Sequence, residues 1–192
     1  MATKPGERKT QILQTLAGML EQPQGEKITT AALAAKVGVS EAALYRHFAS
    51  KAQMFEALIE FIEESVFTLV NQIAQTERDG RAQVQQIVSM LLNFAEKNPG
   101  MVRVLIGDAL VHEDTRLQTR INQLLDRIEA SLKQSLQLAQ ATAGNPALGT
   151  QAGAQANALA AFVIGRWQLF AKSGFKRAPS EFWVEQAALF RI

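Results

Sequence analysis

Apolar residues recur with the period of an α-helix along nearly the whole chain, and this pattern constrains the fold most. Between residues 51 and 75 the apolar side chains share one stripe of a helical wheel. They are Phe55, Leu58, Ile59, Ile62, Val66, Leu69, Val70 and Ile73. Prolines and glycines are few, and β-branched clusters bounded by turn residues are scarce. The sequence therefore predicts an all-α protein.

Turn and capping residues divide the chain into expected helices. Their approximate ranges are 7–22, 41–48, 51–75, 101–110, 115–141, 151–172 and 180–191. A further short helix is expected around Leu33, Ala34 and Val37, and another follows a turn at 77–80 and runs to Lys97. Ser40 and Ser50 are expected N-caps, as is one of the two threonines at 29 and 30. Asn98 is a plausible cap before Pro99, and a surface loop is expected at 143–149.

Residues 28–48 carry the most informative motif, two short helices joined through Gly38. This is the helix-turn-helix arrangement, whose second helix enters the major groove of DNA. Small side chains at Ala42 and Ala43 let the backbone approach base edges, and their methyl groups can touch a thymine methyl. The expected DNA-binding residues are Thr29, Thr30, Ser40, Glu41, Ala42, Ala43, Tyr45, Arg46, His47 and Lys51. A helical hairpin without a ligand is the alternative.

The charge distribution favours the DNA-binding interpretation. The whole chain carries a formal net charge of only +2. Residues 1–55 hold seven Lys and Arg against four Glu, whereas the remainder holds thirteen basic against fourteen acidic residues. The basic part is the part with the motif, as nucleic-acid binding requires.

The stretch from Thr29 to Lys51 resembles the TetR family of DNA-binding proteins, and further stretches resemble its nucleoid occlusion branch. These read SEAALYRHF at 40–48, LIEFIE at 58–63, NPG at 98–100 and RINQL at 120–124. The resemblance thins beyond residue 140, and nothing is carried over for residues 138–161. It implies a homodimer that binds a palindromic chromosomal site without an inducer. It also implies that the bound protein antagonises the tubulin-like division protein FtsZ, so that no septum closes over the nucleoid.

The resemblance places the partner surface on the fourth and fifth helices. Phe61 lies roughly 120° from the centre of the apolar stripe on a helical wheel, and Met90 is displaced similarly on the next helix. An apolar patch with a cation at its rim would suit an extended acidic peptide. The expected partner-binding residues are Phe61, Met90, Asn93, Lys97 and Asn98. Packing of Phe61 and Met90 against the first three helices is the alternative.

The last two helices are rich in apolar residues, and we interpret them as a homodimer interface of four helices from two chains. These residues include Ala158, Leu159, Phe162, Val163, Trp167, Phe182, Trp183, Leu189 and Phe190. Intrachain core is the alternative. Residues 1–51 are then a DNA-binding domain, and residues 52–192 a helical domain for dimerisation and partner binding. A dimer would hold two recognition helices roughly 34 Å apart on a palindrome.

Catalytic chemistry is disfavoured. The chain has no cysteine, which excludes disulfides, thiol nucleophiles and Cys-ligated metals. We interpret His112, Glu113 and Asp114 as a solvated loop, and the four glutamates between residues 56 and 64 as a solvated helix face. We expect no enzyme, metal or cofactor, and a cytoplasmic, nucleoid-associated protein without a membrane span. A ligand-responsive TetR-type repressor is the alternative function, and a helical adaptor is a third.

Overall fold

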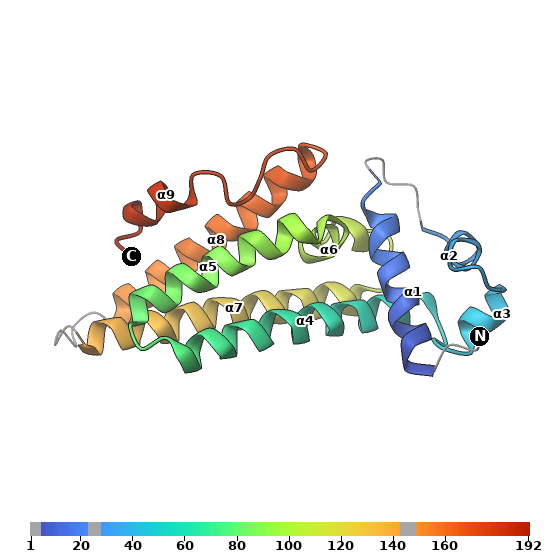
Figure 1. Cartoon of the computed structure of the whole chain (residues 1–192), viewed down its shortest axis with the longest axis horizontal. Helices are drawn as coiled ribbons and strands as arrows, with labels where there is room; N and C mark the ends of the chain where they lie inside the picture. Colours follow the sequence, from blue (N-terminus) through green and yellow to red (C-terminus); the bar gives the residue numbers. More distant parts are fainter. Residues whose placement is uncertain (1–4, 23–27, 143–148) are drawn as a thin grey trace. The chain divides into compact units, whose positions relative to one another are not determined.

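The computed structural model describes residues 5–22, 28–142 and 149–192, which form helices joined by turns (Figure 1). In order the helices are α1 (Pro5–Leu20), α2 (Thr30–Val37), α3 (Glu41–Tyr45), α4 (Lys51–Thr76), α5 (Gly80–Lys97), α6 (Pro99–Leu105), the 3₁₀ helix η1 (Asp108–Leu110), α7 (Thr115–Thr142), α8 (Gly149–Lys172) and α9 (Trp183–Leu189). No strand occurs in these three ranges, so the all-α prediction is confirmed.

Several expected helices are shorter in the structure, and left-handed residues lie beside two of them. Gly107, at a φ of 82°, separates α6 from η1, so the expected helix over 101–110 is wrong. Phe182, at a φ of 62°, delays α9 until Trp183, and α3 ends at Tyr45. Asn98 makes no capping hydrogen bond with its side chain. Most of the expected loop at 143–149 lies outside the described residues.

The chain packs into two compact units that do not follow chain order. Unit 1 contains residues 1–62 and 98–121, and unit 2 contains residues 63–97 and 122–192. The helices α4 and α7 each contribute residues to both units. These units reflect packing and are not the functional division at residue 51, which stays a prediction.

Unit 1 places the helix-turn-helix segment on a core built from α1, α4 and α6. Leu44 and Phe55 are almost completely buried. Because burial of such a side chain contributes about 1.5–3 kcal/mol, Leu44 fixes the short helix α3 to this core. Helix α1 packs on both α2 and α6. A Cβ at Gly100 of α6 would lie 1.9 Å from the carbonyl oxygen of Ala17, so only glycine permits this crossing.

Unit 2 is a helical bundle in which α5 packs against α8. Trp167 of α8 is 1% exposed, and its indole N–H donates to the carbonyl oxygen of Leu91 on α5 at 3.2 Å. A Cβ at Gly80 would lie 2.3 Å from the carbonyl oxygen of Ser135 on α7. The apolar stripe of α7 is buried, and its residues are Leu117, Ile121, Leu124, Ile128 and Leu132.

Among the helices of the described ranges, none combines the length and the apolar character that a membrane crossing needs.

Candidate nucleic-acid interface

The turn between α2 and α3 has the geometry that the motif predicts. Gly38 adopts a left-handed conformation with a φ of 78°. Its N–H donates to the carbonyl oxygen of Ala35 at 3.2 Å, and the N–H of Val39 donates to that of Ala34 at 3.0 Å. This Schellman arrangement satisfies the last carbonyls of α2 and turns the chain into α3. A side chain at residue 38 would disfavour the turn.

Two hydroxyl side chains start the short helices. The Thr29 hydroxyl oxygen accepts from the N–H of Ala32 at 3.1 Å, and the Ser40 hydroxyl oxygen accepts from the N–H of Ala43 at 3.2 Å. Each cap contributes about 1 kcal/mol to helix stability. Both caps are exposed, so their hydroxyl hydrogens can still point to solvent or to a phosphate.

A hydrogen-bonded chain joins the starts of α2 and α3. The Tyr45 hydroxyl donates to Thr30 Oγ1 at 3.4 Å, and the Thr30 hydroxyl donates to Glu41 Oε2 at 2.8 Å. The structure thus brings together three residues of the predicted site. Because Tyr45 is 43% exposed, this network lies at the surface, where its hydroxyl groups can exchange partners.

Several other residues of α3 and the turn after it are exposed or half-buried, whereas Leu44 is buried. Ala42 and Arg46 are exposed, whereas Ala43 and His47 are half-buried. Leu44 is 0% exposed and holds the underside of α3 in the core. A small, open face beside Arg46 could approach base edges and phosphates.

Lys51, another predicted DNA-binding residue, forms an ion pair within unit 1. Its Nζ forms an ion pair with Oε1 of Glu113, and the side chains are 22% and 13% exposed. The interpretation of residues 112–114 as a fully solvated loop is therefore wrong at Glu113. The glutamate face of α4 is not simply solvated either. Glu56 pairs with Arg116 at 3.0 Å, and Glu63 pairs with Arg127.

The predicted partner-binding residues divide between the two units, so their joint surface stays a prediction. In unit 1, Phe61 is 37% exposed on α4 and Asn98 is half-buried. In unit 2, Met90 is half-buried, whereas Asn93 and Lys97 are exposed. The Asn93 amide donates to the carbonyl oxygen of Ser89 at 2.8 Å.

The last two helices combine intrachain core with exposed apolar residues. Leu159, Val163, Trp167 and Trp183 are buried within the chain, so the interpretation of these four as interface is wrong. By contrast, α9 and the residue before it carry exposed apolar side chains. Phe182 is 60%, Val184 82% and Leu189 81% exposed.

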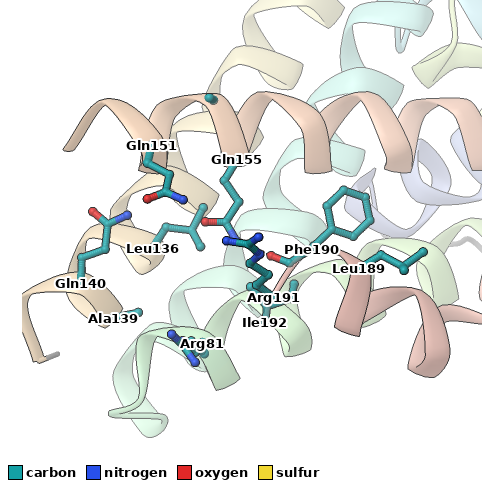
Figure 2. A pocket seen from close by; sticks show the side chains of 11 residues that line it. Arg81, Leu136, Ala139, Gln140, Gln151, Gln155, Leu189, Phe190, Arg191 and Ile192 are labelled. Carbon is teal, nitrogen blue, oxygen red and sulfur yellow. The ribbon is translucent and has the colours of Figure 1, made fainter. Parts of the chain in front are cut away.

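Unit 2 has a pocket of about 540 Å³ between α5, α7, α8 and the C-terminal residues (Figure 2). Its polar lining comes from Arg81, Arg191 and three glutamines, of which Gln155 donates to the carbonyl oxygen of Phe190. Leu136 and Ile192 are part of its apolar lining.

Sequence reasoning missed Glu113 as part of this site. It lies 62 residues from Lys51, and no local pattern connects the two. It also missed the hydrogen bond from Thr30 to Glu41, although both residues were expected near DNA. Within the described ranges, no group of three or more His, Asp or Glu residues could hold a metal ion.

Comparison with known families and relatives gives consistent matches. Residues 25–58 match the family described as bacterial regulatory proteins, tetR family, and residues 78–191 match the tetracyclin repressor-like, C-terminal domain. The chain is 54% identical over 187 residues to nucleoid occlusion factor SlmA of a Marinomonas species, covering 97% of this chain and 94% of that protein. It is 51% identical to nucleoid occlusion factor SlmA of Alteromonas mediterranea, covering 99% of this chain and 97% of that protein.

A solved structure shares the fold. The transcriptional regulator FadR from Bacillus subtilis, in complex with stearoyl-CoA, superposes with a TM-score of 0.76 at 12% identity. The match covers 94% of this chain and 96% of that chain. Identity this low shows a common fold and carries no statement about the ligand.

Proposed function

Because the chain belongs to the SlmA family of nucleoid occlusion factors, within the TetR family of bacterial regulatory proteins, we propose that it binds palindromic chromosomal DNA as a homodimer. When bound, it antagonises FtsZ assembly, so that no septum forms over the nucleoid. It acts in the cytoplasm as a binding protein and not as an enzyme.

The observation that carries the proposal is the hydroxyl network on the helix-turn-helix segment. Thr30, the first residue of α2, is hydrogen-bonded to Glu41 and Tyr45, the first and last residues of α3, and the turn between these helices depends on Gly38. In a helix-turn-helix protein the first helix crosses the DNA backbone and the second enters the major groove. The hydroxyl groups of Thr30 and Tyr45 suit phosphate oxygens. Ala42 and Ala43 leave room for base edges.

Dimerisation is supported by the apolar side chains of α9. A helix that exposes Val184 and Leu189 this fully gains stability when a second copy covers them. Gly165 of α8 gives further support, because a Cβ there would meet no described atom within 4 Å apart from the neighbouring backbone of its own helix. The glycine is free for close approach by another chain.

The partner surface is the second part of the proposal. Phe61, Met90, Asn93, Lys97 and Asn98 would receive an extended, acidic segment of FtsZ. An apolar side chain with 37% exposure, such as Phe61, can anchor a peptide, and the Lys97 ammonium can pair with its carboxylates.

Equilibrium DNA binding tests the first part of the proposal. The probe is a labelled palindromic duplex that the protein itself selects from a random library. Thr30→Ala and Tyr45→Ala should each weaken binding at least about tenfold, because each removes a backbone-positioning donor. Arg78→Ala changes an exposed residue of the turn before α5 and should bind like the wild type. Unchanged affinity in both hydroxyl variants would exclude this DNA-binding surface.

A ligand-responsive repressor is the second candidate function, and the pocket of Figure 2 is the observation that favours it. Two guanidinium groups beside apolar residues would suit an amphipathic anion. Stearoyl-CoA, the ligand in the Bacillus subtilis structure, is a suitable probe. Its addition should leave the DNA complex intact if the first proposal is correct, whereas release of DNA would favour the repressor.

A further inference from the structure

The ammonium group of Lys51 already has an acceptor within unit 1. Lys51 is the first residue of α4, and its Nζ forms an ion pair with Glu113, in the turn before α7. The Phe55 ring centroid lies 5.6 Å from Nζ. Both charged side chains are largely covered, at 22% and 13% exposure. The pair is therefore screened less by salt than an exposed pair would be.

The position of Glu113 is fixed by its neighbours. Asp114 Oδ1 accepts from the N–H of Arg116 at 3.1 Å and so caps α7. The Arg116 side chain then pairs with Glu56 of α4 at 3.0 Å. Since Glu56 and Lys51 are five residues apart on α4, two ion pairs hold residues 113–116 along the start of this helix. The Glu113 carboxylate is thus held beside Lys51 by a segment whose neighbouring residues are themselves fixed to α4.

We propose that Glu113 competes with DNA phosphate for the Lys51 ammonium and thereby limits the affinity of the protein for DNA. This inference rests on the proposed function, which places Lys51 beside the DNA backbone. A phosphate must either displace the carboxylate or share the ammonium with it. Displacement breaks a partly buried ion pair, and sharing brings two anions together. Both effects oppose binding, so loss of the Glu113 charge strengthens it.

Glu113→Gln tests the inference, since glutamine keeps the shape and one acceptor oxygen. Binding to the selected palindrome is measured by fluorescence anisotropy over a series of salt concentrations. The variant should bind about fivefold more tightly per protomer. Its plot of log K against log salt should also be steeper by about 0.9 per protomer. The reason is that the Lys51 ammonium, no longer neutralised by the carboxylate, then neutralises one further phosphate.

Two matched variants isolate the effect. Glu56→Gln removes the same charge from the neighbouring ion pair and should change affinity less than Glu113→Gln does. Lys51→Met removes the contested ammonium, so adding Glu113→Gln to it should give little further gain. Thermal unfolding checks that each variant is folded.

Three results separate the possibilities. A folded Glu113→Gln variant that binds DNA no more tightly than the wild type would overturn the inference. An equal gain in DNA affinity when Glu113→Gln is added to Lys51→Met would also overturn it, since the gain would then come from the change in net charge alone. A wild-type protein that selects no palindrome would instead contradict the proposed function itself.

Discussion

At the residue scale, single contacts set how closely the helices approach, and the sequence pattern does not reveal them. Gly100 was recognisable as part of an Asn-Pro-Gly break, yet its role is the crossing of α6 over α1 at Ala17. The ion pair between Lys51 and Glu113 could not be predicted from the sequence pattern either, because it depends on tertiary packing. By contrast, Gly38 could be assigned from sequence, since a tight turn between two short helices requires a left-handed residue.

Gly100→Ala should destabilise the protein by about 1–3 kcal/mol, because its Cβ would overlap the backbone of Ala17. Gly18→Ala is the matched control, since a Cβ there meets no described atom within 4 Å apart from the neighbouring backbone of α1. It should stabilise α1 by roughly 0.5–1 kcal/mol through helix propensity. Urea unfolding measures both values. Equal stability of the two variants would show that the close crossing does not exist.

Phe61→Ala should leave DNA binding unchanged and abolish the effect on FtsZ, because the side chain is 37% exposed and lies outside the DNA-binding residues. Leu69→Ala is the control, since Leu69 is 39% exposed on the same helix. DNA affinity and FtsZ sedimentation are measured for both variants. If Phe61→Ala loses both activities and unfolds earlier, the side chain belongs to the core.

At the element scale, the long helices could be predicted and their ends could not. The stripe of α7 from Leu117 to Leu132 follows from periodicity alone, because one buried face repeats with the helical turn. The start of α9 is different, since Phe182 adopts a left-handed conformation that its side chain disfavours. Tertiary contacts impose that turn. Arg166 of α8 donates to the carbonyl oxygens of Ala178, Pro179 and Glu181, each at 2.8 Å.

The turn between α4 and α5 should make stability depend on pH. Donation by the backbone N–H groups of Asp79 and Arg78, together with Gln86, holds the pKa of Glu77 below its ordinary value of 4.5. The ionised carboxylate therefore stabilises the folded state above that value. This contribution is lost as the pH falls through the lower folded pKa.

Glu77→Gln should accordingly be less stable than the wild type at neutral pH and equally stable in acid. Thermal unfolding at a series of pH values measures the difference. Glu64→Gln removes the same charge from an exposed position on α4 and serves as the control. If Glu77→Gln is less stable than the wild type by the same amount in acid as at neutral pH, the ionised Glu77 carboxylate is not the source of the stability.

At the scale of the whole molecule, the functional unit that we propose is a dimer with two basic DNA-binding ends. The small net charge of +2 conceals the basic character of residues 1–55. Dimerisation would double the positive charge that this basic part offers to DNA. The fold class could be predicted from the sequence, as could the helix-turn-helix segment. The sequence could not predict which apolar residues of α8 and α9 are buried within the chain, because a core and a dimer interface have similar apolar compositions.

Leu189→Asp should convert the protein to a monomer, because it places a charge on the exposed apolar face of α9. Val111→Asp is the control, since Val111 is 72% exposed on a turn before α7. Sedimentation velocity gives the oligomeric state of each. The monomer should bind a half-site with little preference for the palindrome. A dimeric Leu189→Asp variant would place the interface elsewhere.

Sedimentation of FtsZ polymers in the presence of DNA-bound protein tests the central claim most directly. Purified FtsZ is assembled with nucleotide, and the polymer pellet is measured with the protein and its selected palindrome, singly and together. We predict that the two together reduce the pellet and that a scrambled duplex gives a weaker effect. A pellet unchanged by the DNA-bound protein would contradict the account and favour a transcriptional repressor.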